Sequence, residues 1–413
     1  MDYLQCGSKN NTTGNPFLWS CIMLLIGCGM PNKSYAIESI KPYVATSMLY
    51  DSNFLRVSDN APVSFTGGKS DKSEFIKQVT AGFDMDWIIS RQHVIIKANT
   101  NQNWFQNFTS LDYLGWNTQA QWNWQLWNYL NGEIGYTNAQ TLGSFNNLNR
   151  LLNNLQNNQS YFANAGYLFH PNGKVKFGVF RNEFKYDDKS RQISNNIEDN
   201  AELNLQYLSP TDSILGLRLL ATNGQYPNRQ FTLGDTQDNT YTRFNYALTG
   251  DWHASRKMRI DGFIGYTQQH YAHVSAQNFS GINGRLNLHW QASDKTLLEL
   301  SAIRDITQAQ NLLTNFLLIQ GVAFSLTSEY SPKITLKLPM FYQQQQYLGS
   351  VGTNVFGIEQ QKNNVGNIGF NLMYHPLDNI NIGPVLTYEK RDSNYSFRSY
   401  ETLSAGVNFQ VIF

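Results

Sequence analysis

Hydrophobic and polar side chains alternate one by one along much of the chain. Between Ile380 and Tyr388 the even positions are apolar and the odd positions are mostly small or polar. The same pattern recurs in Met258–Tyr266, Ile282–Trp290, Ile334–Leu338 and Ile368–Tyr374. A repeat of two residues predicts β-strands that have one apolar face and one polar face.

Short and long connections alternate between these expected strands. The short ones carry Pro, Asn, Asp, Ser and Gly, which close tight turns. They are expected at Ile88–Arg91, Leu126–Asn128, Pro171–Gly173, Ser209–Asp212, Ala254–Lys257, Ala292–Lys295, Ser331–Lys333 and Pro376–Asn379. The long connections are polar and irregular, as in Asp51–Ser73, Asn223–Thr236, Gln346–Gln361 and Asp392–Ser399. With a first strand near Ile40–Tyr50 and a last one near Tyr400–Phe413, the expected total is about 18 strands.

An even number of strands with short turns at one end and long loops at the other is typical of outer-membrane barrels. A closed barrel also pairs every backbone group without leaving an exposed sheet edge. We therefore expect an all-β fold, namely a transmembrane antiparallel up-and-down β-barrel with short periplasmic turns and long extracellular loops. The final residues, Gly406–Phe413, alternate and end on an aromatic residue, which resembles the C-terminal signal of outer-membrane proteins. A soluble sandwich or propeller would not show this asymmetry in turn length.

The N-terminal segment predicts export from the cytoplasm. Residues Phe17–Met30 form the one long apolar run, and Ser34-Tyr35-Ala36 follows it as a small-x-small cleavage pattern. We expect residues 1–36 to be a secretory signal peptide that is removed, and residues 37–413 to be the barrel. A rival pattern, Leu25-Ile26-Gly27-Cys28, resembles a bacterial lipobox and would leave Cys28 as an acylated N-terminus. The expected location is the outer membrane of a Gram-negative bacterium, in contact with its lipid.

Composition narrows the chemistry that the chain can perform. The sequence is 41% hydrophobic and 14% aromatic but only 15% charged, with a net charge of +1, so we expect no nucleic-acid partner. Its three cysteines are all within the first 28 residues, which excludes a thiol catalyst or a zinc-thiolate site in the barrel. The two carboxylates Asp84 and Asp86 could serve in acid–base catalysis, but the pattern places no His–Ser pair at the same height in the barrel. We expect no catalytic residues, no metal, no cofactor and no enzymatic activity.

The alternation also predicts which side chains line the lumen and which meet lipid. A wide barrel encloses a hydrated lumen, so its inner side chains should be polar. We expect this lining to include Asn117, Gln119, Gln121, Asn123, Gln125, Glu133, Arg218, Arg243, Arg259, Asp261, Asn283, Arg285, Asn287, His289, Glu299 and Lys337. Such a mixed, amide-rich wall suits neutral or weakly charged polar solutes such as sugars, although any lumen must be polar. The tryptophans Trp116, Trp122, Trp124, Trp252 and Trp290 are expected in an interfacial aromatic girdle.

One expected loop, near residues 140–158, has an unusual pattern. In Ser144–Asn158 apolar residues recur at steps of three and four, which predicts an amphipathic helix. The candidate constriction residues are Phe145, Leu148, Arg150, Leu151, Leu152 and Leu155. Two placements remain open: the helix folds into the barrel and narrows it, or it caps the outer rim.

A ten-residue stretch after the first expected strand carries a family resemblance. Tyr50–Asp59, YDSNFLRVSD, is similar to the Tyr-Asp-x-Asn-(apolar)-(apolar)-Arg-(apolar)-x-Asp segment of EpsL-type proteins. These are β-barrels of exopolysaccharide operons in Gram-negative bacteria, within a broader group of outer-membrane porins. The order Phe54-Leu55 and the Asn-rich stretch Asn146–Asn158 depart from the family pattern.

The resemblance implies that a secreted polysaccharide crosses the outer membrane through this barrel. We accordingly expect a passive exit channel for an extracellular polysaccharide, with that polymer or a sugar as substrate and periplasmic export components as candidate partners. Two alternatives remain open. One is a general or small-solute uptake porin, and the other is a structural barrel that anchors surface polysaccharide.

Overall fold

The computed structural model describes residues 39–413 except 147, 149–150, 233–236, 309–315 and 349–359. These residues up to Phe413 belong to one compact unit. The expected signal peptide and all three cysteines lie outside the described residues. Within the described part of the chain, no helix is long and apolar enough to cross a membrane.

The described residues form a single sheet of 18 strands. Its strands are β1 (Ser39–Asp51), β2 (Glu74–Ile89), β3 (Gln92–Phe105), β4 (Tyr113–Leu126), β5 (Leu130–Leu142), β6 (Leu155–His170), β7 (Gly173–Tyr186), β8 (Asn196–Leu208), β9 (Ile214–Gln225), β10 (Thr240–Ser255), β11 (Met258–Tyr271), β12 (Phe279–Ser293), β13 (Thr296–Gln308), β14 (Phe316–Ser331), β15 (Ile334–Leu348), β16 (Lys362–Leu377), β17 (Ile380–Ser393) and β18 (Tyr400–Ile412). Each pairs antiparallel with the strands before and after it in the sequence. This is the expected up-and-down order.

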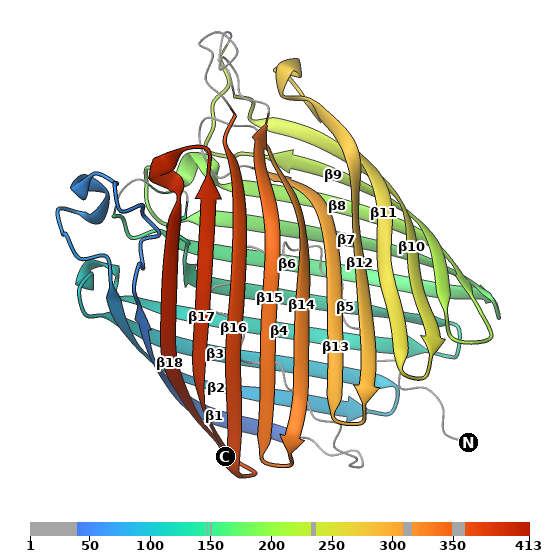
Figure 1. Cartoon of the computed structure of the whole chain (residues 1–413). Coiled ribbons are helices and arrows are strands. Elements are labelled where there is room, and N and C mark those ends of the chain that lie inside the picture. Colours follow the sequence, from blue (N-terminus) through green and yellow to red (C-terminus); the bar gives the residue numbers. More distant parts are fainter. Residues whose placement is uncertain (1–38, 147, 149–150, 233–236, 309–315, 349–359) are drawn as a thin grey trace. The chain divides into compact units, whose positions relative to one another are not determined.

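The sheet closes on itself because β1 pairs with β2 along one edge and with β18 along the other. In Figure 1 the yellow-to-red strands, β10 to β18, cross in front of the blue and green strands of the first half of the chain. Closure leaves no strand edge without a partner, which allows a sheet to exist in a lipid environment. The predicted closed antiparallel barrel is confirmed.

The two ends of the barrel differ in the length of their connections. At one end the strands are joined by tight turns of two to five residues, such as residues 90–91 between β2 and β3 and residues 209–213 between β8 and β9. At the other end the connections are longer, from residues 394–399 up to residues 52–73. In Figure 1 the short turns lie along the lower and right-hand ends of the strands. All eight tight turns overlap the positions that the sequence predicts.

Several connections at the long-loop end share one local device. A short 3₁₀ turn lies just before the returning strand, and the residue after it bonds back to the last residue of the preceding strand. Phe105 N–H donates to Asp112 at 2.8 Å, and Tyr186 N–H donates to Asn195 at 2.8 Å. Tyr271 N–H donates to Asn278 in the same way. Asp and Asn favour such turns because their short side chains reach nearby backbone N–H groups. These connections are therefore structured.

The outer and inner faces of the barrel have opposite character. On β18 the alternate residues Leu403, Val407 and Phe409 are 52%, 48% and 38% exposed and form part of an apolar outer surface. Thr402 and Ser404 point the other way, and both donate to the carboxylate of Asp51 on β1. Apolar side chains thus cover the outside and polar side chains cover the inside, opposite to the arrangement in a soluble protein.

Candidate functional site: the barrel lumen

The lumen wall consists of every second side chain along the strands, which we call the inner row of each strand. On β4, Trp122 is 44% exposed on the outside, whereas its neighbour Gln121 is 4% exposed on the inside. Strand pairing carries this alternation from one strand to the next. The structure places all sixteen expected lining residues on inner rows: Asn117, Gln119, Gln121, Asn123, Gln125, Glu133, Arg218, Arg243, Arg259, Asp261, Asn283, Arg285, Asn287, His289, Glu299 and Lys337.

One side of the lumen is an amide wall, formed by the inner rows of β3 and β4. It comprises Asn99, Asn101, Asn103, Asn117, Gln119, Gln121, Asn123 and Gln125. Within it the amides bond to one another along each strand. Gln119 donates to Gln121 at 3.3 Å and Gln121 donates to Asn123 at 2.7 Å. Because each amide has donors and an acceptor, the wall can exchange these bonds with water or a polar solute.

The inner rows of β8 to β13 form a second wall, which is rich in charged side chains and which we call the charged wall. It comprises Glu198, Glu202, Arg218, Arg243, Asp251, Arg259, Asp261, Arg285, His289, Glu299 and Asp305. Six carboxylates face four guanidinium groups there, so the charges largely cancel. We expect local cancellation of this kind to weaken the preference of the lumen for one sign of ion.

The charged wall is held by ion pairs between strands, and the pair Arg243–Glu198 joins β10 to β8 across the intervening β9. Arg243 contacts both oxygens of Glu198 at 3.0 and 3.1 Å. Arg259 grips Asp251 through two hydrogen bonds of 2.7 and 2.6 Å. Two-pronged bonds of this type fix geometry as well as charge.

Two further members of the charged wall, His289 and Arg218, do not form two-pronged ion pairs. The two ring nitrogens of His289 lie 2.9 Å from Asp261 and 3.1 Å from Glu299. Arg218, 9% exposed, donates to Asn245 at 3.2 Å, and its guanidinium lies 4.5 Å from the ring centre of Phe263. Side chains therefore pack densely along this part of the wall.

An apolar cluster lies inside the long-loop end, above the amide wall. Its buried members are Leu55 and Val57 from residues 52–73, Ile76, Phe105, Phe108, Leu111, Tyr113, Leu142 and Phe145. We call this group the mouth cluster. Since Ile76, Phe105 and Tyr113 belong to inner rows, the loops pack against the inside of the wall. Gly67 has φ +66°, and its missing Cβ would lie 2.9 Å from Leu151, so glycine is favoured there.

Ionic and polar contacts fasten the mouth cluster to strands on the far side of the barrel seam. Arg56 lies 2.9 Å from Asp51 and 3.5 Å from Glu389 of β17, all with largely buried side chains. Arg391 of β17 is 1% exposed and donates to the carbonyl of Asn146 at 2.6 Å. Between β5, which precedes Asn146, and β17 lie β18 and β1 to β4. Asn146 therefore reaches from the end of β5 across the inner side of the mouth toward β17.

The predicted amphipathic helix in Ser144–Asn158 is wrong for the described residues. Residues from Leu155 onward are already in β6, and residues 151–154 have no regular structure. Five of the residues in 146–154 are asparagine, which has low helix propensity. Phe145, Leu148, Leu151 and Leu155 bury themselves in or against the mouth cluster, whereas Leu152 is not part of it. Arg150 lies outside the described residues.

The tryptophans expected in the girdle all lie on outer rows. Trp122, Trp252 and Trp290 are 44%, 58% and 43% exposed and lie near the short-turn end. Trp124 follows Trp122 on the outer row of β4 and is half-buried. Trp116 lies closer to the long-loop end, where its indole N–H donates to Asn138. Aromatic side chains of this kind settle where the hydrocarbon meets water.

Several residues of the site were missed in the sequence. Glu198, Asp305, Arg56 and Arg391 depend on partners far along the chain, so no local pattern indicates them. Phe162 and Phe180 also lie on inner rows. The sequence does not indicate this, because apolar neighbours such as Ala163 and Val179 interrupt the alternation of apolar and polar residues.

A closed 18-stranded barrel with an apolar outside and a polar inside defines an outer-membrane β-barrel of the porin type. Its long loops are then extracellular and its short turns periplasmic. Residues 246–413, about two-fifths of the chain, match the model of a family described as "Putative beta-barrel porin 2". Porins and barrels of this fold are typically channels rather than enzymes. No curated protein matches the sequence.

Solved outer-membrane channels have a similar outline. OpdK of Pseudomonas aeruginosa, crystallised with vanillate, is 10% identical, with a TM-score of 0.48 over 91% of this chain and 99% of that one. OccK2 (OpdF) of the same organism, in complex with glucuronate, is 9% identical, with a TM-score of 0.48 over 91% and 98%. OccAB3 of Acinetobacter baumannii is 10% identical, with a TM-score of 0.46 over 91% and 100%. At this level of similarity their ligands carry no information about the present lumen.

Proposed function

We propose that the protein is a passive channel that admits small polar solutes through the outer membrane. The observation that carries this proposal is the bond from Arg391 of β17 to the carbonyl of Asn146, which holds Asn146 on the inner side of the mouth. A tied loop in the mouth favours small solutes over a polymer chain. The polysaccharide exit that the family resemblance implied receives no support from the comparisons, whereas the description of the matched family as a porin is consistent with the small-solute alternative.

The wall chemistry supports the same proposal. Amides offer many weak and interchangeable hydrogen bonds, so a solute can enter and leave without being trapped. The charged wall pairs its own charges and leaves only a modest field across the lumen. Movement through such a channel follows the concentration gradient, since the described residues supply no source of energy.

Liposome swelling and single-channel recording would test the proposal. We expect the purified barrel to pass monosaccharides and disaccharides faster than hexasaccharides. Deleting residues 144–153 and joining the ends with Gly-Ser should raise both the conductance and the size limit. Arg391→Ala should act in the same direction, because it removes the bond to Asn146. Lys390→Ala, on the outer row of the same strand, is the matched control.

The proposal would be overturned by a barrel that inserts into membranes yet conducts neither ions nor sugars. It would also be overturned by efficient passage of long polysaccharide through the intact protein. Unchanged conductance in both the deletion and Arg391→Ala would remove the mouth loop as the element that sets the size limit.

A further inference from the structure

Two phenylalanines form an apolar patch on the lumen wall between the amide wall and the charged wall. Phe162 of β6 pairs with Phe180 of β7, and Gly135 of β5 pairs with Phe162 on its other side. Their sequence neighbours Tyr161 and Val179 are 46% and 44% exposed on the lipid side. Because side chains alternate, Phe162 and Phe180 point into the lumen.

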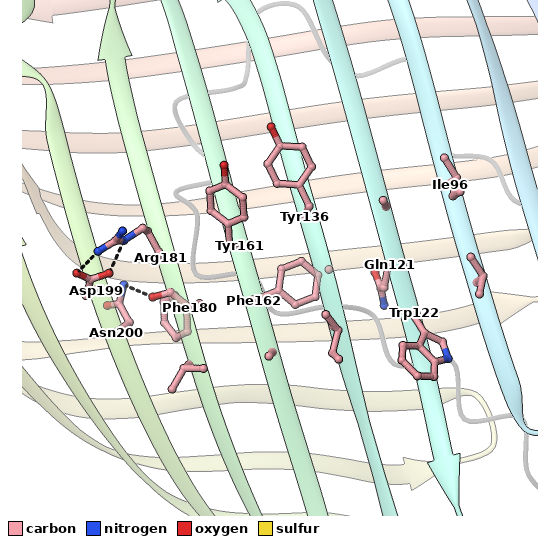
Figure 2. A pocket seen from close by; sticks show the side chains of 16 residues that line it. Ile96, Gln121, Trp122, Tyr136, Tyr161, Phe162, Phe180, Arg181, Asp199 and Asn200 are labelled. Carbon is pink, nitrogen blue, oxygen red and sulfur yellow. Dashed lines mark hydrogen bonds and ion pairs between the residues drawn. The ribbon is translucent and has the colours of Figure 1, made fainter.

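Gly135 allows the ring of Phe162 to lie flat on the wall. A Cβ added to Gly135 would be 2.3 Å from Cζ of Phe162 and 2.8 Å from both Cε atoms. These distances place the face of the ring over the backbone of β5. Figure 2 shows the Phe162 ring reaching from its own strand toward the strand that carries Tyr136. One face of the ring covers the glycine, so the other face is presented to the lumen.

Polar side chains frame the two rings on all sides. Toward the extracellular end, Ser160 donates to Asn182 at 2.8 Å. Toward the periplasmic end, Asn164 donates to Glu133 at 3.3 Å. Aligned with the rings across the sheet, the inner rows of β4 and β8 contain Gln121 and Asn200. Glu202 of β8 completes this frame of seven, none of which is Lys or Arg.

This combination fits one class of ligand. A pyranose presents C–H groups on its face, which are attracted to the electron-rich face of an aromatic ring. Its hydroxyl groups both donate and accept, and therefore pair with amides, a serine hydroxyl and carboxylates. The two carboxylates Glu133 and Glu202 would repel an anionic sugar. The nearest inner-row cation on β7, Lys176, is four residues from Phe180.

We infer that Phe162 and Phe180, within their frame of amides and carboxylates, form a binding platform for neutral saccharides in the lumen. The inference rests on the proposed channel function and adds a substrate class to it. The tryptophans face lipid, so these phenylalanines are the aromatic contacts that a sugar would meet in this part of the lumen.

The test is the block of ion current by maltotriose in planar bilayers, together with calorimetric titration of maltotriose into the detergent-solubilised barrel. Phe162→Leu and Phe180→Leu remove a ring while keeping apolar bulk. Each should weaken maltotriose binding at least about fivefold, because a stacked ring contributes roughly that factor. Phe177→Leu, on the lipid side of β7 and 54% exposed, should leave binding unchanged.

A second variant tests the geometry of the platform while leaving both rings present. Gly135→Ala should weaken binding as well, because the new Cβ forces the Phe162 ring off the wall. Open-channel conductance in potassium chloride shows for each variant that the barrel has folded.

The outcomes separate the inference from the proposed function. A conducting barrel that maltotriose neither blocks nor binds would overturn the platform and leave the channel standing. Equal weakening by Phe177→Leu and Phe162→Leu would also overturn it. Binding in calorimetry without any conductance would support the platform and overturn the channel.

Discussion

The amide wall and the charged wall make the same lumen polar by different means. On the amide wall, Gln119, Gln121 and Asn123 bond along a single strand, and the partly exposed Gln119 and Asn123 can turn to bond water instead. On the charged wall, Arg243 and Arg259 bond across strands to one particular carboxylate each. A charge that loses its partner is costly in a poorly hydrated place, whereas an amide that loses one bond is not. We therefore expect the charged wall to contribute more to stability and ion preference, and the amide wall to tolerate varied solutes.

The largest effect is expected from Arg243→Met on the charged wall. It leaves Glu198 without its ion partner, where the two side chains are only 21% and 15% exposed. The free energy of unfolding should fall by about 2–3 kcal/mol, and the channel should become more selective for cations. Guanidinium unfolding in detergent and reversal potentials in a salt gradient would measure these changes.

A double variant provides the control for Arg243→Met. Adding Glu198→Gln removes the stranded charge and should restore most of the stability and the original reversal potential. If Arg243→Met alone changes neither quantity, the two walls do not differ in the way described.

A smaller effect is expected from Gln121→Ala on the amide wall. Gln121 donates to Asn123 and accepts from Gln119, and neighbouring amides can rebond to water. The free energy of unfolding should change by less than about 1 kcal/mol, and the reversal potential should not change. Gln121→Glu should instead shift the reversal potential toward cations, which shows that the site faces the ion path. A large loss of stability in Gln121→Ala would contradict the contrast between the walls.

The extracellular loops above the two walls are held in the same way, by a buried carboxylate that accepts backbone N–H groups. We therefore expect variants at these carboxylates to have similar effects above both walls. Glu74 and Asp238 are both fully buried carboxylates. Glu74 accepts backbone N–H groups of Asn107 and Phe108, and Asp238 accepts those of Val274 and Asn239. Burial acts to raise the pKa of Asp238, but hydrogen bonds from His273 and nearby backbone outweigh it, so the pKa lies below its usual value.

The smallest effect is therefore a local dependence on acid near Asp238. A depressed pKa gives stabilisation that is complete above the ordinary value of about 3.9 and is lost as the pH falls through the folded value. The amides of His273 and Val274 should stay protected from hydrogen exchange at neutral pH and open only in strong acid. In Asp238→Asn they should exchange faster at neutral pH. Opening of the wild-type loop near pH 6 would contradict the assignment.

Much of the fold could be predicted because alternation and turn chemistry are local. The last strand shows this: Leu403 and Val407 face out and Thr402 and Ser404 face in, as a period of two requires. The lining residues follow from the same rule. The identity of the solute does not, because it depends on how distant strands bring their inner rows together.

The errors and omissions have a physical cause in long-range packing. The spacing of Leu148, Leu151 and Leu155 resembles a helix, yet these side chains are placed by the mouth cluster rather than by a helical face. Arg391 and Asn146 are 245 positions apart, so no local pattern predicts their bond. The ten-residue motif after the first strand acquires a role only in three dimensions, where Asp51, Asn53 and Arg56 turn the chain inward.

The seam between β1 and β18 makes barrel assembly an all-or-nothing event for this chain. The carboxylate of Asp51 accepts a hydrogen bond from Thr402, which lies 351 positions further along the sequence. Bringing ends so far apart together costs about 5 kcal/mol in chain entropy, and nothing repays that cost until the last strand is in place. A chain that stops before β18 would leave the edges of β1 and β17 exposed, so truncated products should be held by chaperones or degraded rather than inserted. The hydrogen bonds from Thr402 and Ser404 to Asp51 hold the first and last strands together once the barrel has closed.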